Sequence, residues 1–473
     1  MDTDAFVAVE LNDAGIATAR SRGDRHAETL GEPSPGYAVL HEGQVLVGRE
    51  AALRHRLAPL NAQNRHWSTL GVEPLPWNAR GVATGADLAY THLAAVLAPA
   101  VQEGLTEALL AVPPGYSRDQ LGLLVGIVNE CGVTARGLVD LGLAGCATVP
   151  AAPHMLHLDL QLHQAAATLV EASRTEGVQR RSRYELLPGV GLLAFDQALA
   201  EAIATTFVRE TRFDPLHQAQ TEQQLHDRLA GWVAALADRA EVAADIEFGS
   251  TTHSLTLERT QMVAAVDRLS AEVLRLVQGA RPAGTQLHVC VTPRVAAVPG
   301  LVERLSALRD CLVVTLAPAA GAVGALQLAA SIVRAPDSIS LVHRVPLQAS
   351  AHAIAATAPA NDAVPPEAVP SHVLFRGRAW PLTPVPLTLG WSVSGSQRAL
   401  SLPAGIAGVS RMHCTLRTVD GQAVVEDQST YGTFVNDERV GGRVALRVGD
   451  VLRLGAPGVT LELIRVLSDH GAT

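Results

Sequence analysis

The hydrophobic pattern divides the chain into a long region of mixed periodicity and a shorter C-terminal region with a period of two. In the long region, apolar residues alternate in two predicted hairpins, at 6–20 and 37–48. Helical periodicity predicts helices over 49–58, 86–102, 117–131 (capped by Ser117), 192–208, 219–240, 260–278, 299–308 and 321–333. Apolar runs predict buried strands over 107–112, 154–160, 286–292 and 311–316. Alternating strands and helices are typical of an α/β fold.

The pattern changes near residue 350, where a stretch rich in proline and alanine has no periodic apolar face. Such composition is typical of an extended, semi-rigid linker, which we assign to 336–370. From 371 to 468, short apolar–polar alternations are separated by Gly, Asp and Asn, which predicts a compact all-β domain. No internal sequence repeat is visible.

Charge and composition exclude several classes of protein. The formal net charge is -9, from 46 Asp and Glu against 37 Lys and Arg, and every one of those cations is arginine. Mechanisms that need a lysine, such as a P-loop or a Schiff base, are therefore excluded. An acidic chain with scattered arginines is not typical of a nucleic-acid-binding protein. The tightest cluster, residues 180–183, is predicted to be a solvated turn.

The cysteines and the N-terminus indicate the cellular compartment in which we expect the protein. The five cysteines are far apart and form no C-x-x-C pair, so neither a disulfide framework nor a metal-binding spacing is present. The acidic N-terminus does not resemble a signal peptide, and no segment has the roughly 18 apolar residues of a membrane helix. We therefore expect a soluble, cytoplasmic protein without membrane insertion.

The most specific motifs lie in the C-terminal region, and they resemble the forkhead-associated (FHA) domain. The segments are Val409-Ser-Arg-Met-His413, Val424-Val-Glu-Asp-Gln-Ser-Thr-Tyr-Gly-Thr-Phe-Val-Asn436 and Leu446-Arg-Val-Gly-Asp-Val-Leu-Arg-Leu-Gly455. The resemblance covers 371–468 and implies a β-sandwich that binds phosphothreonine peptides through loops at one end. It also implies roles for Ser410 as a phosphate donor, Arg411 in the peptide site and Thr430 at the peptide backbone. The positions that it implies brace these loops are Gly390, His413, Gly432 and Asn436.

Two positions depart from the FHA pattern. The family's phosphate-gripping arginine after a glycine is replaced in Gly390-Trp391, and its loop asparagine is Tyr431. Losing a charge-assisted hydrogen bond costs about 1.5–3 kcal/mol. Arg398 could supply the lost charge from the neighbouring loop. The sequence leaves two alternatives open: phosphothreonine binding, or protein contact without phosphate dependence.

Residues 5–333 resemble the two-lobed actin-like ATPase fold, nearest to the nucleotide-binding domain of the DnaK-type heat-shock chaperones. This resemblance implies a first domain at 1–335. The segments that carry it are Val7-Ala-Val-Glu-Leu-Asn-Asp-Ala-Gly-Ile-Ala17, Val45-Leu-Val-Gly-Arg-Glu-Ala51, Ala111-Val-Pro-Pro-Gly-Tyr-Ser-Arg-Asp-Gln120, His157-Leu-Asp-Leu-Gln-Leu-His163, Val289-Cys-Val-Thr-Pro-Arg-Val-Ala-Ala-Val-Pro299 and Ala320-Gly-Ala-Val-Gly-Ala325.

The nucleotide chemistry of that family is degenerate here. The first phosphate turn carries Glu10, Asn12 and Asp13, and Asp13 adds a negative charge where a γ-phosphate would approach. The second loop keeps Asp159 but has no glycine to let the backbone close on phosphate. Thr292-Pro293 replaces the bare Gly-Gly of the adenosine motif, and no catalytic lysine exists. We therefore expect a pseudo-ATPase with no catalytic residue and no cofactor. Any residual nucleotide cleft would involve Glu10, Asp13, Asp159, Gly191 and Gly321.

Two other chemistries have weak support. His157, Asp159, Gln161 and His163 lie on one face of a strand, as metal ligands often do, but a polar cleft face inherited from a phosphate loop explains them better. No G-x-S-x-G motif follows a strand, which disfavours a hydrolase.

Two functional hypotheses follow. In the first, the protein is a non-catalytic scaffold or adaptor that binds a protein partner, either through phosphothreonine or without it. FHA analogy places such an adaptor in a bacterial kinase-linked or secretion-type assembly. In the second, an ATP-binding, chaperone-like switch or weak ATPase controls FHA binding through closure of its cleft.

Overall fold

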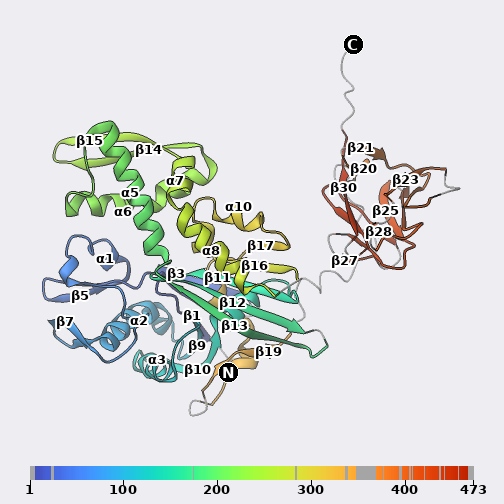
Figure 1. Ribbon diagram of the computed structural model, residues 1–473. Helices are drawn as coiled ribbons and strands as arrows, with labels where there is room; N and C mark the ends of the chain where they lie inside the picture. The colour runs from blue at the N-terminus through green and yellow to red at the C-terminus, as the bar shows by residue number, and fades with distance from the viewer. Residues whose placement is uncertain are drawn as a thin grey trace. The chain divides into compact units, whose positions relative to one another are not determined.

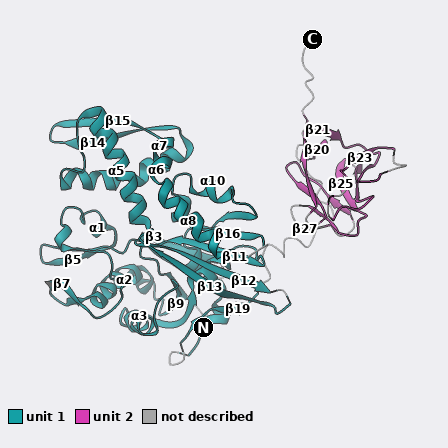
Figure 2. Ribbon diagram, viewed as in Figure 1, with its two compact units in different colours: residues 1–355 teal, residues 356–473 magenta. Residues whose placement is uncertain are grey.

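The computed structural model describes residues 6–22, 26–173, 175–282, 285–335, 339–347, 369–376, 378–393, 397–403, 406, 408–419, 421–435, 438–440, 443–455 and 458–466. The chain forms two compact units, residues 1–355 and 356–473, which we call the body and the C-terminal unit (Figure 2). Among the described helices, none is long and apolar enough to cross a membrane.

The body contains two six-stranded sheets (Figure 1). In the first sheet, β1 to β3 form an antiparallel meander, and β9 and β10 add to β1 in parallel. The order across this sheet is β18 (Leu341–Val342), β10 (Thr134–Asp140), β9 (Glu107–Val112), β1 (Phe6–Glu10), β2 (Ile16–Arg22) and β3 (His26–Ser34).

The second sheet repeats this arrangement. Its strands β11 to β13 form an antiparallel meander, and β16 and β17 add to β11 in parallel. The order is β17 (Cys311–Thr315), β16 (Leu287–Val291), β11 (His154–Leu160), β12 (Gln164–Ser173), β13 (Val178–Pro188) and β19 (Arg344–Pro346). The body is therefore a topological duplication, although its two halves share no visible sequence repeat.

Helices cover both sheets and fill the space between them. The first sheet packs on α2 (Gly85–Gln102) and α3 (Arg118–Glu130). The second packs on α8 (Asp267–Ala280) and shares one apolar core with α5 (Leu192–Thr211) and α6 (Ala219–Asp238). Between the sheets lie α4 (Leu141–Cys146) and α11 (Ala320–Gln327), whose small residues share one core with both sheets. They cross closely, because a Cβ on Gly324 would lie 1.9 Å from the Ala144 carbonyl oxygen.

The remaining elements of the body are short or peripheral. Two hairpins, β4–β5 and β7–β8, lie in the first half, and β14–β15 lies beside α5 and α6 in the second (Figure 1). Their bounds, with those of the other short elements, are β4 (Ala38–His41), β5 (Gln44–Val47), α1 (Gly48–Ala52), η1 (Pro59–Asn61), β6 (Ala62–Gln63), β7 (Pro74–Ala79), β8 (Val82–Thr84), β14 (Glu241–Phe248), β15 (Thr251–Glu258), α7 (Arg259–Ala265), α9 (Pro293–Ala296), α10 (Leu301–Ser306) and α12 (Ala329–Ile332).

The structure confirms several local predictions and corrects others. Ser117 caps α3 by accepting a hydrogen bond from the Gln120 amide at 3.2 Å. The helix predicted over 49–58 ends at Ala52. Residues 180–183 are part of strand β13 and not a solvated turn, and Arg181 pairs there with the buried carboxylate of Asp140 at 2.8 Å.

The predicted linker starts too early. Residues 341–346 form β18 and β19, which complete the edges of the two sheets of the body. They were missed because each strand has only two or three residues, too few for a period of two to be visible. Most of the other residues of the 336–370 prediction lie outside the described residues.

The C-terminal unit is a sandwich of two largely antiparallel sheets around a single apolar core. Leu389 and Leu416 come from one sheet and meet Leu452 and Leu461 from the other. The first sheet has the order β21 (Arg378–Pro381), β20 (His372–Phe375), β30 (Val459–Ile464), β29 (Val451–Leu454), β26 (Thr433–Val435), β27 (Glu438–Arg439). The second has the order β23 (Ala399–Ser401), β22 (Leu387–Gly390), β24 (Cys414–Val419), β25 (Gln422–Asp427), β28 (Arg443–Ala445).

Candidate functional site

Three loops of the C-terminal unit meet at one end of its sandwich. They follow β22, precede β24 and follow β25. The Trp391 amide donates to the Ser410 carbonyl oxygen at 3.3 Å, and the Thr430 amide donates to Ser410 Oγ at 3.1 Å. Ser410 therefore sits between the other two loops. A hydroxyl that accepts through one lone pair still carries a hydrogen that it can donate to a ligand.

Buried groups hold this loop end in place. His413 is fully buried; its Nδ1 accepts from the Ser410 amide at 3.0 Å and its Nε2 donates to the Gly432 carbonyl oxygen at 3.1 Å. Burial lowers the pKa of His413, which keeps the imidazole neutral and able to make both bonds. Gly390 is required by close approach, because a Cβ there would lie 2.0 Å from the Arg411 carbonyl oxygen.

The same loops present a cation and three large apolar side chains to solvent. The Arg411 guanidinium carbon lies 5.5 Å from the centre of the Trp391 ring, a cation–π distance. Trp391, Met412 and Tyr431 are 39%, 45% and 59% exposed. These loops thus combine one solvent-facing positive charge with apolar surface.

One predicted position, Arg398, does not join this group. Arg398 donates to Thr383 Oγ1 and to the carbonyl oxygens of Pro381 and Val385, beside the start of β22, whereas Trp391 follows the end of that strand. Arg398 therefore does not replace the missing arginine. Asn436 lies outside the described residues.

Residues 393–455 match the family model described as the FHA domain. The C-terminal unit contains an FHA domain. The search of curated proteins finds no match. Neither the family models nor curated relatives support the resemblance of residues 5–333 to heat-shock chaperones. The FHA domain supports a role in protein interaction, and its loop end is the first candidate site.

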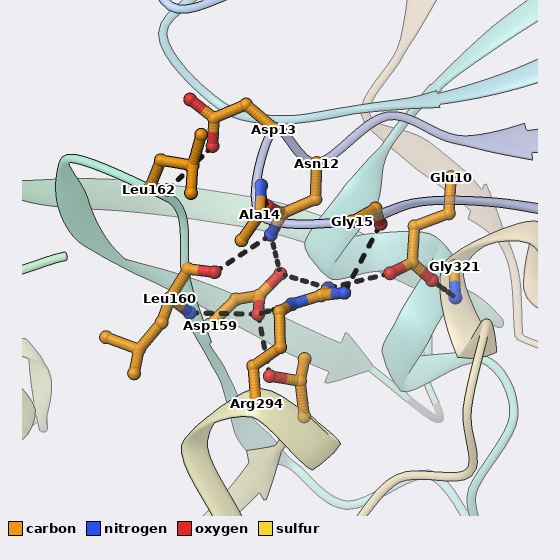
Figure 3. Close-up of polar contacts among 11 residues, drawn as sticks. Glu10, Asn12, Asp13, Ala14, Gly15, Asp159, Leu160, Leu162, Arg294 and Gly321 are labelled. Carbon is orange, nitrogen blue, oxygen red and sulfur yellow. Dashed lines mark hydrogen bonds and ion pairs between the residues drawn. The ribbon is translucent and has the colours of Figure 1, made fainter. Parts of the chain in front are cut away.

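A second polar cluster lies in the body, where the two sheets approach each other (Figure 3). It joins Glu10 at the end of β1, Asp159 near the end of β11 and Arg294 in α9. Arg294 donates to Asp159 through Nε at 3.1 Å and Nη2 at 3.0 Å, and to Glu10 through Nη2 at 2.7 Å. Both carboxylates are buried, and the arginine holds the pKa of Asp159 below its usual range.

The remaining oxygens of this cluster have hydrogen-bond donors as well. Asp159 also accepts from Thr292 Oγ1 at 2.6 Å, and Glu10 accepts from the Gly321 amide at 2.8 Å. Gly321 is tightly enclosed, since a Cβ there would lie 2.3 Å from Leu141 Cδ1 and 2.9 Å from Glu10 Oε2. The cluster is therefore saturated by groups of the chain itself.

The two hairpin turns above the cluster are bonded directly to each other. Asn12 in the first turn donates to Asp159 Oδ2 at 2.7 Å and to the Leu160 carbonyl oxygen at 3.2 Å. Asp13 accepts from the Leu162 amide at 2.8 Å, while its second carboxyl oxygen is buried without a hydrogen-bond partner. Burial raises the pKa of Asp13 to about 6.

A magnesium–nucleotide complex, which the resemblance to ATPases implies, does not fit this arrangement. The carboxylates that could take a cation already hold a guanidinium, and the Leu162 amide that could face phosphate donates to Asp13. At neutral pH a buried Asp13 carboxylate would also repel a phosphate. Gly191, which was predicted to line this cleft, lies against the backbone of the second turn. A Cβ on Gly191 would lie 2.4 Å from the Gln164 nitrogen.

Sequence reasoning missed Arg294, the central residue of the cluster. The residue stands directly after the Thr292-Pro293 pair that broke the adenosine motif. The only available signal was a cation at this position in a chain without lysine, together with carboxylates in the two predicted phosphate turns. Its partner Glu10 is 284 positions away, so no local pattern could reveal the pairing.

The structure also places the residues of the candidate metal site. His157 is buried, His163 bonds to the Asn64 carbonyl oxygen and Gln161 bonds to Gln164. Among the residues that the structure describes, no group of three His, Cys, Asp or Glu side chains is placed to hold a metal.

A serine–histidine pair in the body, Ser34 and His92, has its proton on the wrong side for a nucleophile. His92 Nδ1 accepts from Trp67 Nε1 at 3.0 Å, so the neutral ring must carry its proton on Nε2. This Nε2 donates to Ser34 Oγ at 2.8 Å and cannot accept the serine proton. Burial lowers the pKa of His92 to about 4, which keeps the ring neutral.

Proposed function

We propose that the protein is a non-catalytic adaptor whose FHA domain binds a protein partner through phosphothreonine. The observation that carries this proposal is the position of Ser410 and Arg411 on a loop end that is braced from below. Arg411 is exposed, and the Ser410 hydroxyl lies between two loops. A guanidinium and a hydroxyl on one rigid loop are suitable donors for a phosphate dianion.

Trp391 changes how the phosphate would be held. With no arginine at this position and Arg398 engaged elsewhere, Arg411 is the cation that we assign to the phosphate. Stacking on Trp391 limits the positions that the guanidinium can take, which lowers the entropy lost on binding. The exposed Tyr431 and Met412 provide apolar surface for residues next to the phosphothreonine.

For the body we propose an actin-like fold that is retained as a scaffold without ATP hydrolysis. The duplicated sheet order supports the fold, because both halves run through three antiparallel strands and then two parallel ones. The Glu10–Arg294–Asp159 cluster supports the loss of hydrolysis. Partner recognition is thus assigned to the FHA domain.

The experiment is a fluorescence-polarisation titration of the full chain with a degenerate peptide library carrying a fixed central phosphothreonine. The unphosphorylated library and a phosphoserine library are measured in parallel. We expect binding of the phosphothreonine library alone. Arg411→Ala should reduce affinity more than tenfold, because one charge-assisted bond is worth about 1.5–3 kcal/mol.

Two further variants make this experiment specific. Ser410→Ala should weaken binding by a smaller factor, since it removes a neutral donor. Arg398→Ala is the matched control, because Arg398 bonds at Pro381–Val385, and it should bind like wild type. Equal capture of phosphorylated and unphosphorylated libraries would refute the phosphothreonine proposal and leave a phosphate-independent adaptor.

The alternative function, an ATP-controlled switch, is favoured by one observation. A cavity of about 800 Å³ is lined from both halves of the body, by segments 55–69, 162–164 and 188–197. Calorimetric titration with Mg-ATP decides between the two. Micromolar binding that is lost in Asp159→Ala would support the switch, and no heat at millimolar ATP would support the scaffold.

A further inference from the structure

Arg294 connects the two halves of the body. It is on α9, directly after β16 of the second sheet, and it reaches Glu10 at the end of β1 in the first sheet. Its other carboxylate partner, Asp159, belongs to the second sheet. Figure 3 shows the guanidinium between these two carboxylates, with the dashed contacts leaving on both sides.

Burial makes this charge arrangement consequential. The side chains of Arg294, Glu10 and Asp159 are 16%, 5% and 3% exposed. Two carboxylates so close together in a low-dielectric site need a cation, because neither water nor salt can screen them. Ion-binding proteins commonly meet this need with a metal, whereas here a side chain of the same chain does so.

Neutral donors complete the arrangement. Thr292, Asn12 and the Gly321 amide each donate to one of the two carboxylates. The Asn12 bond and the bond from Leu162 to Asp13 also cross between the halves. The contact between the halves is therefore a continuous polar network with Arg294 at its centre.

We infer that Arg294 is the body's own cation, which occupies the place between Glu10 and Asp159 that a metal–phosphate complex would need and holds the two halves closed without a ligand. In this cleft a side chain of the chain itself takes the place of a ligand. The body then keeps one closed conformation at any nucleotide concentration. This inference stands whether or not the FHA domain binds phosphothreonine.

The first test is thermal unfolding of the full chain with and without MgCl2, and with and without Mg-ATP. We expect the unfolding temperature of the body of the wild type to stay constant in all four conditions. An increase with Mg-ATP in the wild type that disappears in Asp159→Asn would overturn the inference.

The second test removes the cation. Arg294→Met should lower the unfolding temperature of the body by several degrees and increase hydrogen exchange in the two turns, residues 11–15 and 160–163. The control is Arg268→Met, since Arg268 is 78% exposed and pairs with Glu272 one turn along α8. An Arg294→Met protein that matches this control in both measurements would refute the inference.

A charge-balanced double variant covers the case in which Arg294→Met does not fold. Arg294→Met combined with Glu10→Gln leaves Asp159 as a single carboxylate with Thr292 and Asn12 as donors. If the guanidinium acts as a counter-ion, this double variant should be more stable and yield more folded protein than Arg294→Met. A double variant no more stable than the single one would show that the charge of Arg294 is not its role.

Discussion

The two polar sites of this protein use the same side chain in opposite ways. Arg411 in the FHA domain is exposed and stacks on an aromatic ring, so its positive charge can reach an external anion. Arg294 in the body is buried between two carboxylates, so its charge is already neutralised by the chain. The difference teaches that the surroundings of an arginine, and not its presence in a degenerate motif, decide whether it can bind a ligand.

The distribution of charge along the sequence extends this comparison. Residues 371–473 contain ten arginines and eight carboxylates, whereas residues 1–370 contain 27 arginines and 38 carboxylates. The negative charge of the chain thus resides outside the FHA domain. An anionic peptide experiences repulsion from the body and a weakly positive field at the FHA domain, which favours docking at the latter.

The largest effect is expected from Asp159→Asn, which tests whether the body depends on its internal ion cluster. The variant leaves Arg294 with one buried carboxylate, Glu10, and removes the negative charge that accepts two of its hydrogen bonds. Removing one partner of a buried ion pair costs about 3–5 kcal/mol. Urea unfolding followed by hydrogen-exchange mass spectrometry measures the free energy of unfolding of each unit separately.

The control for this variant is Asp267→Asn, whose carboxylate is 67% exposed and pairs with Arg304. Exposed pairs contribute about 0–1 kcal/mol, so this change should be small. The FHA domain should keep its stability in both variants. A body of Asp159→Asn that is as stable as that of Asp267→Asn would remove the contrast between the two sites.

The sequence predicted the FHA domain better than the body because the FHA signal is local. Ser410, Arg411 and His413 are neighbours in the chain, and the bonds among Ser410, His413 and Thr430 follow from two short segments. The error at Arg398 has a simple cause. Proximity along the sequence suggested proximity in space, but β22 separates its contacts at Pro381–Val385 from Trp391.

In the body, the sequence indicated strands and helices but not their partners. Strand β12 was missed because it is rich in alanine, which is a weak strand former. Strand β13 was missed because arginines and glutamates interrupt its apolar alternation, and most of its side chains are partly or fully exposed. The duplication of topology was invisible because it conserves strand order and not residues. Glu10 and Asp159 were predicted as cleft residues, and the structure does place them together, but through an arginine that no motif indicated.

An intermediate effect is expected from Asp13→Asn, which tests the turn contact between the two halves. Burial raises the pKa of Asp13 to about 6 from an ordinary 3.8, so the folded body binds a proton more tightly than the unfolded chain. The contribution of this proton to stability is present at low pH and is lost as the pH rises through 6. Asn should therefore stabilise the body at pH 8 by up to about 3 kcal/mol, and this gain should vanish near pH 4.

Urea unfolding of wild type and variant at pH 4, 6 and 8 measures this effect. The difference between the two proteins isolates Asp13, because the buried His66 and His92, whose pKa values are lowered, titrate in both. Asp238→Asn, at an exposed carboxylate at the end of α6, is the control. A gain in Asp13→Asn that is independent of pH would contradict the titration.

The smallest effect is expected from Trp391→Ala, which tests whether stacking prepares Arg411 for its ligand. A cation–π contact at an exposed site is worth about 0.5–1 kcal/mol, so phosphothreonine-peptide affinity should fall about two- to fivefold. Trp391→Phe keeps an aromatic face beneath the guanidinium and should lose less. If both variants bind like wild type while Arg411→Ala does not, Arg411 reaches the phosphate without the support of Trp391. The FHA domain would then differ from the body only in exposing its arginine, and not in how it positions that side chain.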